Sequence, residues 1–196
     1  MEETEKRSGR GKPRDENLRK TILDASAALL LESGYRRFTI EGVAARAGAS
    51  KVTIYKWWPS KGSLALDGYI HAVTDSIAFP HTASPRADVE AQLTSVILAF
   101  TTTASGRAIV ELIGAAQEDP DLKRDLVARL IQPRRELAAG AFARFLGWDL
   151  ATRRNDLYAV TDQIYGAVYH RLLLGLEPLE PSFARRLIDF WVPTDN

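Results

Sequence analysis

The sequence contains no cysteine among its 196 residues. This absence excludes disulfide scaffolds, thiolate zinc sites, iron–sulfur clusters and cysteine nucleophiles. The three histidines, His71, His81 and His170, lie far apart and form no i, i+4 pair, so we expect no metal and no cofactor. Motifs of the G-x-S-x-G, H-E-x-x-H and phosphate-loop types are missing too, and we therefore expect no enzymatic activity.

Long apolar runs are also missing. No segment approaches the roughly 18 uninterrupted apolar residues of a membrane span. The opening segment, MEETEKRSGRGKPRDEN, has no apolar stretch of the kind that a secretory signal needs. We therefore expect a cytoplasmic protein with no membrane partner.

The formal net charge is only +1, but the charges are distributed unevenly. Residues 1–61 hold 13 Lys and Arg against 8 Asp and Glu, whereas residues 62–196 hold 13 against 17. A basic front and an acidic rear are typical of a chain whose N-terminal end meets a polyanion such as nucleic acid. The alternative is a chance segregation of solvated surface charges, and charge alone leaves both open.

The N-terminal end begins with a polar segment. Residues 1–14 have no apolar periodicity, and we predict a disordered basic arm there. A helix is predicted from Asp15 onward, with Gly34 as its C′ residue in the left-handed conformation. The apolar stripe that predicts this helix consists of Leu18, Ile22, Ala25 and Leu29.

Two short helices follow, predicted over about 40–47 and 51–57. Thr39 and Ser50 are their expected N-caps, and Pro59 ends the second helix. A Gly-containing turn, AGAS, joins them. Two helices of two turns each, joined by a short turn of this kind, are typical of a helix-turn-helix DNA-binding motif.

The second short helix has the side chains that a recognition helix needs. Such a helix presents polar groups and cations to base edges in the major groove, while apolar residues anchor it from behind. Val52 and Ile54 are expected to turn inward, and the alternative is that they present an apolar edge to a thymine methyl group. Trp58 is expected to lie in the core, and Tyr55 to place its hydroxyl on a phosphate. The candidate DNA-binding residues are Thr39, Arg46, Ser50, Lys51, Thr53, Tyr55, Lys56 and Lys61. Each has a structural alternative, because the hydroxyls can serve only as caps and the cations can be solvated surface charges.

The rest of the chain is predicted to be helical, which makes the expected fold all-α. Ser60 is expected to cap a helix over about 61–79. Pro133 lies inside a helical pattern, so a kink near 129–133 is expected. The other predicted helices cover 87–104, 106–117, 121–146, 153–175 and 181–192.

The last two helices carry more apolar surface than one core needs. Segment 157–176 is apolar nearly all round, and a helix of this kind must be buried on more than one side. Segment 183–191 adds an apolar stripe near the C-terminus. We therefore predict a homodimer face over about 157–191. The alternative is that both helices form only the intramolecular core.

With these motifs in place, the sequence resembles the TetR family of bacterial transcriptional regulators. The family pattern opens helix 2 with Thr, has Ala-Gly-x-Ser in the turn and Thr-x-Tyr in the recognition helix, and ends with an aromatic residue and Ser-Lys. The matching residues are Thr39-Ile40, Val43-Ala44, Ala47-Gly48-Ala49-Ser50, Thr53-Ile54-Tyr55, Trp58, Ser60-Lys61 and Leu64. Trp58 stands where the family usually has Phe, and Gly62 stands where Glu is common.

The resemblance implies an all-α homodimer with two domains. Residues 15–60 would form the helix-turn-helix DNA-binding domain, and residues 61–196 the ligand-binding and dimerisation domain, with 61–79 as the connecting helix. The implied function is a sequence-specific regulator, most often a repressor released from double-stranded operator DNA by a small-molecule effector. Alternatives are an activator, or a protein-interaction regulator without a small ligand. Candidate effector contacts are Phe100, Ile113, Gln117, Tyr165 and Tyr169.

Overall fold

The computed structural model describes residues 12–74 and 77–191, with side chains from residue 16 onward. Over these residues it contains helices and no strands, which confirms the all-α prediction. In chain order the helices are α1 (Lys12–Arg37), α2 (Ile40–Ala47), α3 (Lys51–Trp57), α4 (Lys61–Val73), α5 (Pro85–Thr102), α6 (Ala104–Ala116), α7 (Pro120–Leu126), η1 (Val127–Ile131), α8 (Gln132–Leu146), α9 (Arg154–Leu174) and α10 (Pro181–Trp191).

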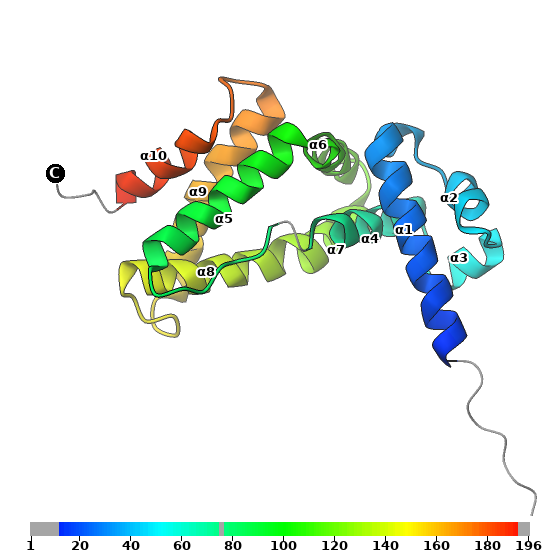
Figure 1. The fold of residues 1–196 in the computed structure, drawn as a ribbon, viewed down its shortest axis with the longest axis horizontal. Helices are drawn as coiled ribbons and strands as arrows, with labels where there is room; N and C mark the ends of the chain where they lie inside the picture. Colours follow the sequence, from blue (N-terminus) through cyan, green and yellow to red (C-terminus); the bar gives the residue numbers. More distant parts are fainter. Residues whose placement is uncertain (1–11, 75–76, 192–196) are drawn as a thin grey trace, which may run out of the picture.

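The molecule is elongated. Figure 1 shows α1, α2 and α3 gathered at one end and α5, α8, α9 and α10 at the other. Helices α4, α6 and α7 lie between the two ends, and α4 and α6 both pack against α1.

Helix α1 begins at Lys12 rather than at Asp15, so the predicted arm is shorter, and residues 1–11 lie outside the described residues. Gly34 has a positive φ of 77°, as expected, but its ψ of 167° is extended rather than left-handed helical. This combination of φ and ψ is essentially restricted to glycine, and a Cβ on Gly34 would also lie 2.7 Å from the Glu111 carboxylate. The chain therefore kinks at Gly34 and makes one more helical turn to Arg37.

The two short helices form where the sequence predicts them. Thr39 caps α2 by accepting a hydrogen bond from the Gly42 amide, and Ser50 caps α3 by accepting one from the Thr53 amide. Gly48 ends α2 with φ of 62° and ψ of 31°, a left-handed conformation that glycine adopts without a steric penalty. Caps and turn together confirm the helix-turn-helix.

Helix α4 is shorter than predicted, since it ends at Val73 instead of near residue 79. Ser60 caps it as expected, in a capping box with Ser63. Residues 77–79, which were predicted to be helical, are not in a helix. Ile77 and Phe79 instead line a cavity. Gly62, the departure from the family pattern, is buried, and a Cβ there would lie 3.3 Å from Leu122 of α7.

The predicted break near Pro133 is present as a π-helical turn. Residues Val127–Ile131 form η1 between α7 and α8, and the Gln132 amide bonds the carbonyl of Val127, five residues back. Proline has no N–H and its ring clashes with the carbonyl four residues earlier, here that of Arg129. The wider π turn accommodates this ring without ending the helix.

One hydrophobic core runs through both ends of the molecule. Trp58 is 2% exposed and belongs to it, as predicted, and so do Ile54 and Tyr69. Within the described residues no single helix is long and apolar enough to cross a membrane, and only α5 and α6 taken together, across an 87° bend, pass that test.

Candidate functional site: DNA interface and interior cavity

Helix α3 presents one face to solvent. Val52 is 71% exposed and Tyr55 51%, and Lys56 is exposed beside them. The expectation that Val52 turns inward is therefore wrong, whereas Ile54 is fully buried as expected. Ile54 shares the inward face with Trp58 four residues later, and residue 52 lies on the opposite side of a helix with about 100° per residue.

An exposed valine on a recognition helix can do chemistry that polar residues cannot. The methyl group of thymine projects into the major groove, where apolar side chains contact it. Lys56 makes no ion pair or hydrogen bond within the described part of the chain, so its ammonium group is available to a phosphate or a guanine. Val52, Tyr55 and Lys56 are thus the accessible candidates on α3.

Two of the other predicted cations are paired with carboxylates. Lys51 donates to Glu41 at 3.0 Å, and Arg46 donates to both oxygens of Glu32 at 2.6 and 2.7 Å. These hydrogen bonds raise the pKa of Lys51 and lower the pKa of Glu41. Both pairs are exposed, and exposed ion pairs contribute little to stability, so a phosphate can displace either carboxylate.

Lys61, at the first turn of α4, is half-buried and packs over the Tyr35 ring, 4.5 Å from its centroid. Burial lowers the pKa of Lys61 below its usual range, and the nearby Glu111 opposes this shift. Thr39, Ser50 and Thr53 are held in cap hydrogen bonds, which is the structural role considered above. Contact of any of these residues with DNA stays a prediction.

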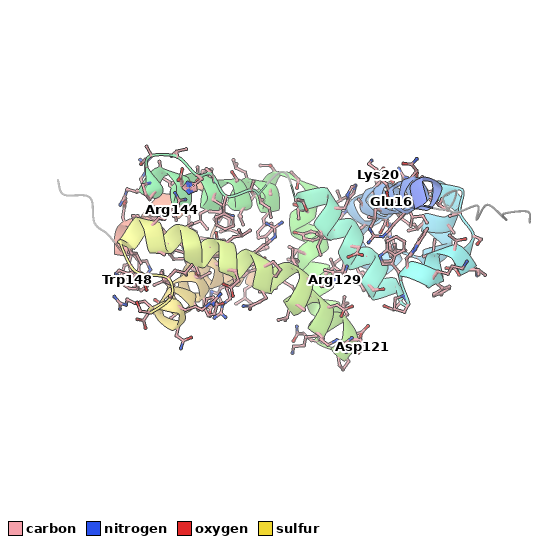
Figure 2. All side chains as sticks on the ribbon, turned by 90° about the horizontal axis from the view of Figure 1, so that it is seen from below. Glu16, Lys20, Asp121, Arg129, Arg144 and Trp148 are labelled. Carbon is pink, nitrogen blue, oxygen red and sulfur yellow. The ribbon has the colours of Figure 1, made fainter. Side chains whose placement is uncertain are left out.

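A chain of polar contacts links α3 to the other end of the molecule. Trp58, directly after α3, donates from Nε1 to Oδ2 of Asp67 on α4 at 2.7 Å. The other oxygen of Asp67 pairs with Arg129 in the π turn, and the Asp67 side chain is only 11% exposed. Helices α7, η1 and α8 follow one another without a break, and we call them the α7–α8 rod. Figure 2 shows Arg129 where this rod meets the helices of the DNA-binding end.

A second link joins α6 to the end of α1. Arg107 donates to the carbonyl of Leu31 at 2.7 Å, and Glu111 accepts from the Arg36 amide at 3.2 Å. These contacts satisfy backbone groups that the kink at Gly34 leaves free. The cavity-lining helices therefore hold the helix-turn-helix from two sides.

The helices that follow α4 enclose a partly open cavity of about 340 Å³. Phe100, Ile113, Tyr165 and Tyr169 line it, and all four were sequence candidates. Gln117, the fifth candidate, is not among the residues that line it. It is exposed at the end of α6, where its side chain donates to the carbonyl of Ile113. The other lining residues are Ile77, Phe79, Gln92, Val96, Leu126, Ile131, Arg134, Arg135, Ala138, Thr161, Asp162, Gly166 and Leu173.

The cavity is apolar with a few polar groups. Tyr165 donates to Gln92, and Arg135 pairs with Asp162, so these four groups satisfy one another. Arg134 lines the cavity too, but it makes no hydrogen bond or ion pair within the described part of the chain. Sequence reasoning missed Arg134, because nothing in the run QPRRE distinguishes it from its neighbour.

Several large apolar side chains on and next to the last two helices are exposed to solvent. Phe190 of α10 is 84% exposed, and Leu174, at the end of α9, is 62% exposed. Leu173 and Leu176 are 41% and 47% exposed. The segment 157–191 therefore leaves several large apolar side chains exposed, and apolar surface of this kind can serve as an interaction surface where it is contiguous.

Two family models match this chain, one over the helix-turn-helix and one over the helices that follow it. Residues 22–67 match the model of the bacterial regulatory proteins, tetR family, and residues 79–190 match that of the tetracyclin repressor-like C-terminal domain. The chain is 37% identical to the uncharacterized HTH-type transcriptional regulator YdeS of Bacillus subtilis (strain 168), over 92% of this chain and 91% of that protein. It is 29% identical to the DNA-binding transcriptional repressor TetR of Mycobacteroides abscessus, over 90% of this chain and 92% of that protein.

A solved structure agrees with these matches. The crystal structure of the TetR family transcription regulator SCO0332 superposes with a TM-score of 0.78 and 43% identity, covering 92% of this chain and all of that one. Both family models fall on the parts that the fold separates, the helix-turn-helix at one end and the cavity-bearing helices at the other. The chain belongs to the TetR family of bacterial transcriptional regulators.

Proposed function

We propose that this regulator is a repressor that binds operator DNA through α3 and leaves it when a small molecule enters the cavity. The observation that carries the proposal is the pairing of two features in one chain. The capped recognition helix exposes Val52, Tyr55 and Lys56. A cavity of about 340 Å³ lies in the other domain, which packs against the helix-turn-helix. That volume lies within the ~300–1,000 Å³ of small-molecule sites. Such a protein works where the chromosome is, in the cytoplasm.

The working unit that we propose is a homodimer formed through α9 and α10. Phe190 and Leu174 leave apolar surface that a second copy would cover. Two-fold pairing presents two recognition helices, which fit adjacent major grooves when they are about 34–36 Å apart. The two arms of a palindromic operator would then meet the same residues in both copies.

The ligand acts in this proposal by shifting a population. The dimer interconverts between arrangements that differ in the separation of the recognition helices, and the ligand favours one of them by binding it more tightly. The contact chain from Arg129 through Asp67 to Trp58 supports this route, because Leu126 and Ile131, on either side of Arg129 in the sequence, line the cavity. A displacement of the π turn would reach α4 and the end of α3.

The test is fluorescence anisotropy of the full-length protein on labelled DNA from upstream of its own gene. We expect tight binding that scrambled DNA does not displace, at two salt concentrations. The variant Tyr55→Ala should lose this binding while its elution as a dimer is unchanged. Binding that is weak, steeply salt-dependent and equal for scrambled DNA would contradict sequence-specific regulation at this site.

A further inference from the structure

The cavity lining carries an unequal number of charges. Among the described residues that line it, Arg134 and Arg135 bring two guanidinium groups and Asp162 brings one carboxylate. Asp162 is held by Arg135 through two hydrogen bonds. One positive charge, that of Arg134, therefore remains uncompensated at the wall of an otherwise apolar space.

Arg134 is an uncommon residue for such a wall. It is half-buried, and burial lowers the pKa of its guanidinium, although arginine stays charged at neutral pH. Buried charges in proteins are normally paired, because an unpaired one loses its hydration without compensation. Tyr69, Tyr165 and Tyr169 are its nearest electrostatic neighbours, and none of them is an anion at neutral pH.

A second polar group near Arg134 also lacks a partner. The hydroxyl of Tyr69 is buried and makes no hydrogen bond within the described part of the chain, and it lies within electrostatic range of Arg134 and Tyr169. Buried hydroxyls are rarely left without a partner, so each exception calls for an explanation. Tyr69 itself is not among the residues that line the cavity, so its hydroxyl marks an unsatisfied polar group behind the wall that carries Arg134. A charged guanidinium is the group on this wall that can donate hydrogen bonds to an anionic oxygen.

We propose that the effector is an amphipathic anion whose carboxylate, or another anionic oxygen group, pairs with Arg134 while its apolar part lies against Phe100, Ile113 and Tyr169. This rests on the proposed function, since it names the chemistry of that same site. The rings of Phe100 and Tyr169 are 5.5 Å apart and supply an apolar surface for the tail. The volume of about 340 Å³ is near the lower end of the ~300–1,000 Å³ range, which favours a medium-chain acid over a long acyl conjugate.

Three probes with one tail and different head groups test this. Decanoate, decanol and decyltrimethylammonium are titrated into the full-length protein by calorimetry at neutral pH, each below its micelle-forming concentration. Decanoate should bind about 10- to 100-fold more tightly than decanol, because a hydrogen bond to a charged group is worth more than one between neutral groups. The ammonium probe should bind most weakly, because Arg134 repels it.

Variants assign the preference to Arg134. Arg134→Gln should bind decanoate and decanol equally, and Arg134→Lys should keep the preference for decanoate, a result that a purely structural role would not produce. Arg124→Gln is the matched control, since it removes the same charge from an exposed pair with Asp121 on α7 and should change nothing. The head-group comparison in the unaltered protein needs no variant to fold.

Equal affinity of the unaltered protein for decanoate and decanol overturns the proposal, and so does the absence of binding by all three probes. Operator binding is measured in the same preparation. A protein that binds DNA but does not discriminate the head groups contradicts only the ligand class. Decanoate that binds through Arg134 but leaves operator binding unchanged supports the ligand class and contradicts the proposed release mechanism.

Discussion

The indole of Trp58 donates a hydrogen bond to Asp67, and this single contact fastens the end of the recognition helix to α4. Trp58 is 2% exposed, so most of its indole lies away from water and Asp67 is the hydrogen-bond partner of its N–H. Because Asp67 also pairs with Arg129, the carboxylate is shared between the DNA-binding end and the π turn.

Removing the carboxylate should therefore be costly. We expect Asp67→Ala to lower the free energy of unfolding by about 1–3 kcal/mol, because it leaves the indole N–H buried without a partner. In Trp58→Phe the donor is gone as well, so the two changes should not add. A double-mutant cycle in urea, followed by circular dichroism, measures this coupling. Strictly additive losses would show that the contact does not stabilise the fold.

Glu41 limits the positive charge of the DNA-facing surface. It holds Lys51 at 3.0 Å and is itself exposed. We expect Glu41→Gln to raise affinity for operator DNA and to steepen the salt dependence by up to about one unit, because Lys51 becomes available to a phosphate. Lys56→Ala should do the reverse and flatten the slope by about one unit. Anisotropy titrations over a salt series measure both slopes, and unchanged slopes would place both lysines away from the DNA.

Phe190 provides a direct test of the homodimer. It is 84% exposed on α10, and we expect Phe190→Ser to shift the protein toward the monomer and to make its melting temperature more dependent on concentration. Leu137→Ser, which also removes an exposed apolar side chain but from α8, is the control. Sedimentation velocity over a range of concentrations distinguishes the two. A dimer that tolerates Phe190→Ser as well as the control would rule out this face.

Asp88 should contribute to stability in a pH-dependent way. It is 2% exposed, and a hydrogen bond from Thr82, reinforced by Arg144, lowers the pKa of its carboxyl despite the opposing effect of burial. A carboxyl with a lowered folded-state pKa stabilises the protein above its unfolded pKa of about 3.9, and this contribution is lost as the pH falls below that value. We measure the free energy of unfolding in urea between pH 7 and pH 3. It should fall less toward pH 3 for Asp88→Asn than for the unaltered chain. Parallel curves would contradict this assignment.

Gly106 is where α6 passes the end of α5. A Cβ there would lie 1.9 Å from the carbonyl oxygen of Phe100, a backbone atom that cannot move aside alone. We expect Gly106→Ala to destabilise the fold by about 1–3 kcal/mol or more. Gly114→Ala, in the same helix with open space around it, should stabilise by about 0.5–1 kcal/mol. Thermal melts of the two variants should move in opposite directions.

Local features of this fold were predictable because they depend on neighbours in the sequence. Thr39, Ser50 and Ser60 cap helices through hydrogen bonds that span three residues, and Pro133 disturbs a helix through its own ring. The orientation of Val52 was missed because a helix of seven residues has too few apolar positions to define its face. The inward side was decided by the core that receives Ile54 and Trp58.

The cavity was harder to predict than the helices. Phe100 and Tyr169 were identified because apolar residues of a helical bundle face its interior, which the helical pattern reveals. Gln117 was misplaced because α6 ends at Ala116 and turns it to solvent. Arg134 was missed because its lack of a partner depends on where Asp162 lies, 28 positions along the chain, and Asp162 pairs with the neighbouring arginine.

The π turn has a consequence for angular register along the α7–α8 rod. In a continuous α-helix two residues five positions apart face directions that differ by about 140°. Bonding from residue i to i+5, as between Val127 and Gln132, brings residues five apart toward the same side. Arg129 lies inside this turn and holds Asp67, whereas Arg134 follows it on α8 and lines the cavity, so a change of register at the π turn would alter the angle between these two guanidinium groups.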